Sequence, residues 1–193
     1  AASDVYKRQI MDKCKQDRQT ILFSATLDEE VSEIVESYQE DPLRVGIGPE
    51  EVSMDRMQHF FWKINSRGKA ELASYIAEKC GRSIIFCRTR AGVNRLGDEM
   101  SEMDLSFTTL HGGMKQKQRD RSMHKFSAGQ ARVMIATDVA SRGIDVDDVN
   151  CVIHFDPPDD GKAYKHRSGR TARAGSTGTG VSLVLRSQNS QYK

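Results

Sequence analysis

Short apolar runs alternate with amphipathic stretches along most of the chain. Strand-like runs, rich in β-branched and aromatic residues, occupy 57–64, 83–87, 107–110, 132–136, 150–155 and 180–185. Stretches with apolar residues at helical spacing lie between them, at 68–79, 91–103, 115–126 and 161–172. Alternation of this kind indicates crossover connections, so we predict a three-layer α/β domain with a parallel sheet.

A shorter pattern precedes this one. We expect a strand over 19–23, a helix over 29–39 and a strand over 43–47, whereas residues 1–9 match no expected element. Residues 1–47 are therefore predicted to be the closing part of another α/β domain. The Gly- and Pro-containing stretch 48–56 is the predicted linker, and residues 57–193 are the second domain.

Composition narrows the class of protein. No apolar run approaches the roughly 20 residues of a membrane span, so no membrane association is expected. The cysteines are scattered without metal-ligand spacing, which favours reduced core thiols in a cytoplasmic protein. The net charge of +2 is uneven, because residues 1–105 carry −4 and residues 106–193 carry +6. The C-terminal part is thus the half expected to face a polyanion, and charge alone does not separate nucleotide from nucleic acid.

The segment His166–Gly175 (HRSGRTARAG) is the strongest candidate for chemistry. On the expected helix, His166, Arg170 and Arg173 share one face, and Arg167 lies about a quarter-turn away. No Asp or Glu follows Asp160, so no carboxylate nearby in sequence neutralises this cluster. Arginine forks bind phosphate oxygens bidentately, which favours a phosphate site over an ordinary solvated basic face.

Further polar residues are expected at the carboxyl ends of the strands, where parallel sheets bind ligands. Three loops carry them, and each also has a purely structural interpretation as a turn or cap. The candidate residues are Thr89 between Arg88 and Arg90; Gly112 and Gly113 ahead of Gln116 and Arg119; and Thr137 ahead of Arg142, Gly143 and Asp145. The phosphate-cradling GxxxxGK[ST] loop and an acidic tetrad for magnesium are not found in the sequence.

Taken together, five motifs resemble the DEAD-box RNA helicases, in that family's order and at about its spacing. They are SAT at 24–26, FCRT at 86–89, HGG at 111–113 with Gln116 and Arg119, ATDVASRGID at 136–145, and HRSGRTARAG at 166–175. The likeness covers about residues 19–184, and DPP ahead of the last motif looks like bacterial members. The position of Arg88 is more often asparagine in the family.

The resemblance implies that residues from about 57 onward form the second of two RecA-like domains, with ATP and RNA bound between the two. Mg²⁺ would be held by the first domain, and no metal ligand is expected in this chain. The resemblance also implies roles for individual residues. Arg170 and Arg173 would be arginine fingers, and His166 and Arg167 would couple them to the first domain. The nucleotide would be contacted by Asp145, Arg142 and Gly143, and Ser24 and Thr26 would relay hydrolysis to strand separation. RNA would be contacted by Thr89, Arg90, Gly112, Gly113, Gln116, Arg119 and Thr137.

The leading hypothesis is thus the C-terminal half of an ATP-dependent RNA helicase, monomeric and inactive without the first domain. RNA would be held through its backbone, with little sequence specificity. The alternatives are a non-catalytic RNA-binding helicase-like module and a DNA translocase of a neighbouring family.

Overall fold

The computed structural model describes residues 2–15, 17–23, 29–45, 57–141, 149–171 and 177–185. The chain divides into two compact units, 1–50 and 51–193. None of the helices in the described ranges is long and apolar enough to cross a membrane.

Unit 1 contains two helices, α1 (Ala2–Lys13) and α2 (Glu29–Tyr38). The Tyr38 hydroxyl donates to Asp12 Oδ1 at 2.8 Å, and Arg8 pairs with Glu33 at 3.2 Å, so polar contacts join the helices. The helix α1 was not expected, because residues 1–9 match no predicted element. The strand predicted over 19–23 is wrong, and 43–45 is not a strand either, because a strand persists through pairing and the described part of unit 1 supplies no partner strand.

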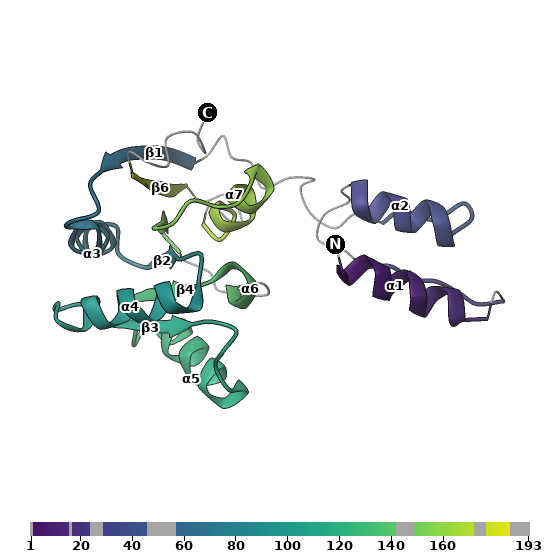
Figure 1. The fold of residues 1–193 in the computed structure, drawn as a ribbon, viewed down its shortest axis with the longest axis horizontal. Coiled ribbons are helices and arrows are strands. Elements are labelled where there is room, and N and C mark those ends of the chain that lie inside the picture. The colour runs from purple at the N-terminus through teal and green to yellow at the C-terminus, as the bar shows by residue number, and fades with distance from the viewer. Residues whose placement is uncertain are drawn as a thin grey trace. The chain divides into compact units, whose positions relative to one another are not determined.

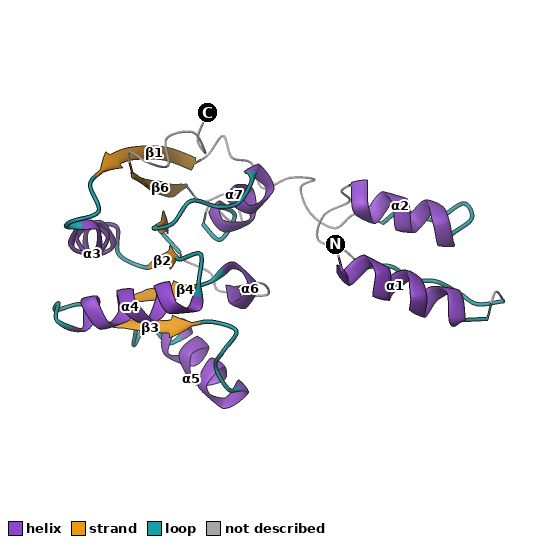
Figure 2. Ribbon diagram, viewed as in Figure 1, coloured by secondary structure: helices purple, strands orange, loops and turns teal. Residues whose placement is uncertain are grey.

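Unit 2 alternates strands and helices nearly as the apolar pattern predicts (Figure 2). Its elements are β1 (Met57–Ile64), α3 (Lys69–Cys80), β2 (Ser83–Phe86), α4 (Arg90–Ser101), β3 (Phe107–Leu110), α5 (Gln116–Ser127), β4 (Val133–Ala136), α6 (Asp138–Ser141), β5 (Cys151–His154), α7 (Gly161–Ser168) and β6 (Gly178–Leu185).

The strands form one six-stranded sheet in the order β1-β6-β5-β2-β4-β3, shown as arrows in Figure 1. Every neighbouring pair is parallel. The edge strand β1 pairs with β6, and Met57 lies opposite Gly178. The predicted class, a parallel-sheet α/β domain, is confirmed.

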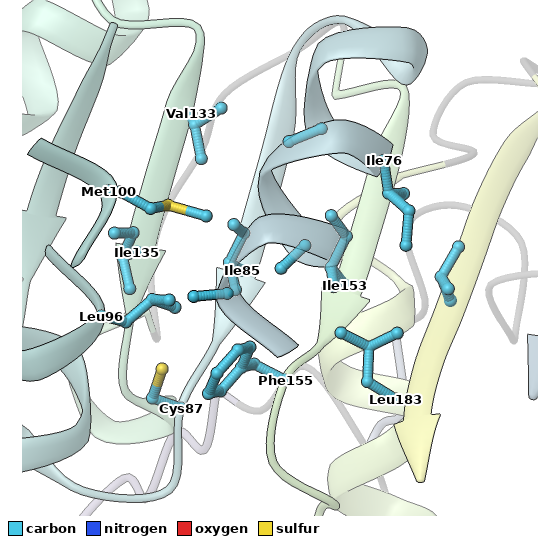
Figure 3. Close-up of a cluster of buried hydrophobic side chains, with 14 of the residues drawn as sticks. Ile76, Ile85, Cys87, Leu96, Met100, Val133, Ile135, Ile153, Phe155 and Leu183 are labelled. Carbon is cyan, nitrogen blue, oxygen red and sulfur yellow. The ribbon is translucent and has the colours of Figure 1, made fainter. Parts of the chain in front are cut away.

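Alternate residues of the central strands supply two cores, one on each face of the sheet. One core joins Ile85, Ile135 and Ile153 to α3 and α4 through Ile76 and Leu96 (Figure 3). The other joins strand residues to α5 and α6; its members include Ile84, Phe86, Met134, Phe126 of α5 and Ala140 of α6. Burial on both faces explains why these strands are continuously apolar.

The cysteines follow the prediction only in part. Cys87 and Cys151 are fully buried, and burial raises the pKa of the Cys87 thiol to about 12. Cys80 is half-buried, whereas Cys14 is exposed on unit 1 and is not a core thiol.

Candidate functional site

The candidate residues lie together at the carboxyl-terminal end of the parallel strands. Thr89 follows β2, Gly112 and Gly113 follow β3, and Thr137 follows β4. Because β3, β4 and β2 are consecutive neighbours in the sheet, three loops distant in sequence lie next to one another. These three loops form the candidate site.

Thr89 is the N-cap of α4. Its hydroxyl oxygen accepts a hydrogen bond from the Gly92 amide at 2.9 Å. The structural interpretation of Thr89 as a helix cap is therefore correct. The hydroxyl can still donate its own hydrogen to a phosphate, so the RNA-binding interpretation remains compatible with the cap. Cβ atoms added at Gly112 and Gly113 would lie 3.4 Å from the Nη2 and Cδ atoms of Arg90, so the two glycines let this arginine pack closely over the loop after β3.

His111 organises the loop after β3. Its Nδ1 accepts from the Gly113 amide at 3.2 Å, and its Nε2 lies 3.0 Å from Asn94 Oδ1. An acceptor Nδ1 places the proton on Nε2, which then donates to Asn94. Burial, followed by the charges of Arg90 and Arg119, lowers the pKa of His111 and favours this neutral form. Gly113 is exposed as expected, but its amide already donates to His111 Nδ1.

Gln116 and Arg119 open α5. The Gln116 amide donates to Asp120 Oδ1 at 2.7 Å, and Arg119 Nη2 donates to the Ala140 carbonyl at 3.4 Å. Arg119 therefore contacts α6, directly after the strand end that bears Thr137. Thr137 is 7% exposed, and its amide donates to Leu110 at the end of β3.

Arg167 departs most clearly from the sequence expectation. It is 2% exposed, and its Nε and Nη2 donate to the two oxygens of Asp138 at 2.6 and 2.7 Å. Its Nη1 donates to the Asp156 carbonyl at 2.7 Å, and its guanidinium lies 5.2 Å from the Phe86 ring centroid. No carboxylate nearby in sequence neutralises Arg167, as expected, but the fold brings Asp138 to it from 29 residues away.

The expectation that His166 and Arg170 lie on one face of a continuous helix is also wrong. The α7 helix ends at Ser168 instead of continuing to 172, and Gly169 is its C-cap, with its amide donating to Lys165 and Arg167. Arg170 follows in a turn, and its Nε donates to the His166 carbonyl at 3.3 Å. Contact between the two residues thus survives without the helix. Arg173 lies outside the described residues, as do Arg142, Gly143, Asp145, Ser24 and Thr26.

Lys69 and Asp156 also lie at this end of the sheet, although the sequence did not predict a role for either. Lys69, the first residue of α3, is 7% exposed, and its Nζ lies 3.5 Å from Asp156 Oδ1. Asp156 stands two residues beyond β5, at the same sheet edge as Thr89 and Thr137. Its position after an apolar run was a usable signal, whereas the burial of Lys69 was not visible in sequence.

The described residues include no group of three or more His, Cys, Asp or Glu side chains able to hold a metal ion. The chemistry available among them is that of hydroxyls, amides and arginines, which are donors for phosphate oxygens.

Comparisons with known proteins agree with this chemistry. A family model described as "Helicase conserved C-terminal domain" matches residues 68–175. The ATP-dependent RNA helicase DbpA of Bacillus subtilis is 35% identical over 170 residues, which cover 87% of this chain and 36% of DbpA. Eukaryotic initiation factor 4A of Cryptosporidium parvum is 35% identical over 189 residues, 93% of this chain and 46% of that protein.

The fold agrees as well. The structure of S. cerevisiae Dbp5 bound to RNA and ADP BeF3 superposes with a TM-score of 0.78 at 28% identity. The match covers 98% of this chain and 50% of the Dbp5 chain. The chain therefore spans half or less of the length of these relatives.

Proposed function

Because the chain belongs to the helicase conserved C-terminal domain family, within the DEAD-box RNA helicases, we propose that unit 2 is the second RecA-like domain of an ATP-dependent RNA helicase. Residues 1–47 would be the end of the first domain and 48–56 the linker. The observation that carries the proposal is the family match together with the edge at which Thr89, Gly112 and Thr137 meet.

The proposed reaction is hydrolysis of ATP coupled to clamping and local unwinding of RNA. ATP and Mg²⁺ would be held by an ATP-binding domain on the amino-terminal side. Arg170 and Arg173 would reach the terminal phosphate across the interdomain cleft. The phosphoryl transition state carries charge on its equatorial oxygens, and an arginine placed against them contributes factors of about 10³–10⁵ in rate. Hydrolysis would then require the two domains to close.

RNA would bind along the strand-end loops. The Thr89 hydroxyl, Arg90 and Arg119 are donors for phosphates and sugars, and such contacts hold a strand without reading its bases. Closure of the domains would bend the held strand away from a regular partner. The physical result is separation of a short stretch of duplex.

Arg167 takes a revised role in this proposal. Its nitrogens donate to Asp138 and to the Asp156 carbonyl, so it would hold residues 166–170 in place within unit 2 instead of coupling the arginine fingers to the first domain. His166, Arg170 and Arg173 remain the residues of that segment proposed to act at the interdomain cleft.

The test is Arg170→Ala in the longer protein that includes the ATP-binding domain. We expect RNA-stimulated ATP hydrolysis to fall by about 10³-fold while RNA binding persists. Arg95→Ala is the matched control, because Arg95 is exposed on α4 and pairs only loosely with Glu99, at 3.9 Å. An unchanged rate in Arg170→Ala would contradict the arginine-finger role.

A second measurement addresses the non-catalytic alternative. The 193-residue chain alone is expected to hydrolyse ATP at the background rate, and the longer protein to respond to RNA more than to DNA. Salt-dependent RNA binding by a longer protein without ATP hydrolysis would favour the RNA-binding module instead.

A further inference from the structure

Lys69 and Asp156 form a largely buried ion pair that the proposed function does not use. The Lys69 ammonium lies 3.5 Å from Asp156 Oδ1 and 4.3 Å from the centroid of the Phe155 ring. Burial lowers the pKa of Lys69, and the Asp156 charge opposes that shift. An ammonium in this position is costly without its partner, so the pair needs a structural or functional reason.

The second oxygen of Asp156 holds the loop after β2. Asp156 Oδ2 accepts from the Arg88 amide at 3.0 Å, and the Asp156 amide donates to the Phe86 carbonyl at 3.1 Å. Since β2 and β5 are neighbours with Phe86 opposite His154, the backbone bond continues the ladder beyond the strands, and the carboxylate adds a side-chain bond to it. The carboxylate therefore fixes the backbone directly before Thr89.

The main chain of Asp156 contacts the arginine segment, residues 166–170, through Arg167. Its carbonyl accepts from Arg167 Nη1 at 2.7 Å, and Arg167 in turn grips Asp138, next to Thr137. One residue thus contacts both the loop that leads to Thr89 and the last turn of α7, ahead of Arg170. The start of α4 lies beside the carboxylate, because a Cβ added at Gly92 would lie 3.7 Å from Asp156 Oδ2, at ordinary van der Waals distance.

We propose that Asp156 is a positioning residue that holds the Arg88–Thr89 loop and the Arg167 segment in one fixed relation, so that RNA affinity and ATP turnover depend on it together. This inference rests on the proposed function. It goes beyond that function because it assigns the link between the two binding elements to a residue that touches neither ligand.

A merely structural ion pair is the competing explanation, and Lys69→Met distinguishes the two. This variant removes the ammonium and keeps the carboxylate bonded to the Arg88 amide. Asp156→Ala removes the carboxylate that accepts from the Arg88 amide and keeps the carbonyl that accepts from Arg167, so it breaks the link between the two. Asp156→Asn keeps a side-chain oxygen acceptor without the charge. Asp159→Asn is the matched charge control, because Asp159 lies in the same loop, 3.6 Å from Arg88 Nε, with its side chain 78% exposed.

The experiment measures kcat and the RNA concentration for half-maximal ATPase stimulation in the longer protein, with thermal unfolding of each variant. A hydrogen bond to a charged group is worth about tenfold or more in an equilibrium, so Asp156→Ala is expected to raise the half-stimulating RNA concentration about tenfold and to lower kcat. Asp156→Asn should recover most of both. Lys69→Met and Asp159→Asn should stay within about threefold of the wild type, even though Lys69→Met also lowers the unfolding temperature.

Equal functional losses in Lys69→Met and Asp156→Ala, in step with their unfolding temperatures, would overturn the inference. So would an Asp156→Ala variant within about threefold of wild type in both constants. A wild type without RNA-stimulated hydrolysis would contradict the proposed function instead. In that case, hydrogen exchange of the Arg88 amide in the 193-residue chain decides, because Asp156→Ala should accelerate it about tenfold relative to Lys69→Met. Equal exchange in the two variants would overturn the positioning role.

Discussion

Arg167 illustrates how a charged side chain becomes part of a protein interior. Each of its guanidinium nitrogens has an acceptor, and the Phe86 ring lies beside the same group. Removing one partner of such a pair leaves the other charge unsatisfied, which is costlier than losing an exposed ion pair. A motif arginine can therefore serve the fold while its neighbours in sequence serve chemistry.

Arg167→Met is expected to lower the free energy of unfolding by about 3 kcal/mol, because Asp138 and the Asp156 carbonyl lose their donor. Urea denaturation measures the change, and Trp62, the only tryptophan, reports on unit 2. Arg95→Met on the exposed face of α4 is the control, with an expected change below about 0.5 kcal/mol. Similar losses in both variants would contradict a special role for the buried pair.

At the scale of elements, α4 shows two glycines with opposite functions. A Cβ at Gly92 would lie 3.2 Å from the Thr89 hydroxyl oxygen, which caps the helix, whereas a Cβ at Gly97 would make ordinary contacts of 3.4 and 3.5 Å with Thr109 and Phe107. Gly92 thus protects the cap. Gly97 only lowers the helix propensity.

Substitution by alanine should change the free energy of unfolding in opposite directions at the two glycines. Gly97→Ala is expected to raise the free energy of unfolding by about 0.5–1 kcal/mol through helix propensity. Gly92→Ala should lower it by about 0.5–1 kcal/mol, because the capping oxygen must move. Denaturant midpoints of the two variants, measured side by side, check the prediction. A stabilised Gly92→Ala would show that the cap tolerates the extra methyl group.

The apolar pattern predicted the elements of unit 2 because burial on both faces of the sheet leaves a strong signal. Strands such as 57–64 and 107–110 were predicted to the residue. The end of α7 was missed because the run of small and basic residues after Gly169 remains compatible with a helix. The pairings of Arg167 with Asp138 and of Lys69 with Asp156 were invisible, since they join residues 29 and 87 positions apart. The unit 1 strands failed because pairing partners, not local preference, maintain a strand.

For the molecule as a whole, His154 links stability to pH. It is fully buried and stacks on Tyr164 with ring centroids 4.6 Å apart, and its Nε2 lies 3.2 Å from the Ser168 hydroxyl. Burial, followed by the charges of Arg167 and His59, lowers the pKa of His154 to about 3. The unfolded chain binds a proton at this histidine near pH 6.5, whereas the folded chain does not until about pH 3.

Stability contributed by the neutral His154 should therefore be complete above about pH 6.5 and be lost as the pH falls toward 3. The expected slope is up to about 1.4 kcal/mol per pH unit in the free energy of unfolding. Urea denaturation between pH 7 and 5, a range in which most carboxylates stay ionised, measures it. His154→Gln should flatten the curve relative to its matched control, His124→Gln on the surface of α5. Parallel curves for the two variants would contradict the assignment.

The pairing of β1 with β6 has a consequence for how the protein is made. Met57 and Gly178 lie opposite each other in the paired strands β1 and β6 but are 121 positions apart along the chain. A ribosome adding about 5–20 residues per second releases the first strand roughly 6–24 s before its partner. During that interval the aromatic residues Phe60, Phe61 and Trp62 are carried by a segment with no strand beside it in this sheet. The edge strand β1 can therefore join the sheet only after β6 has been synthesised.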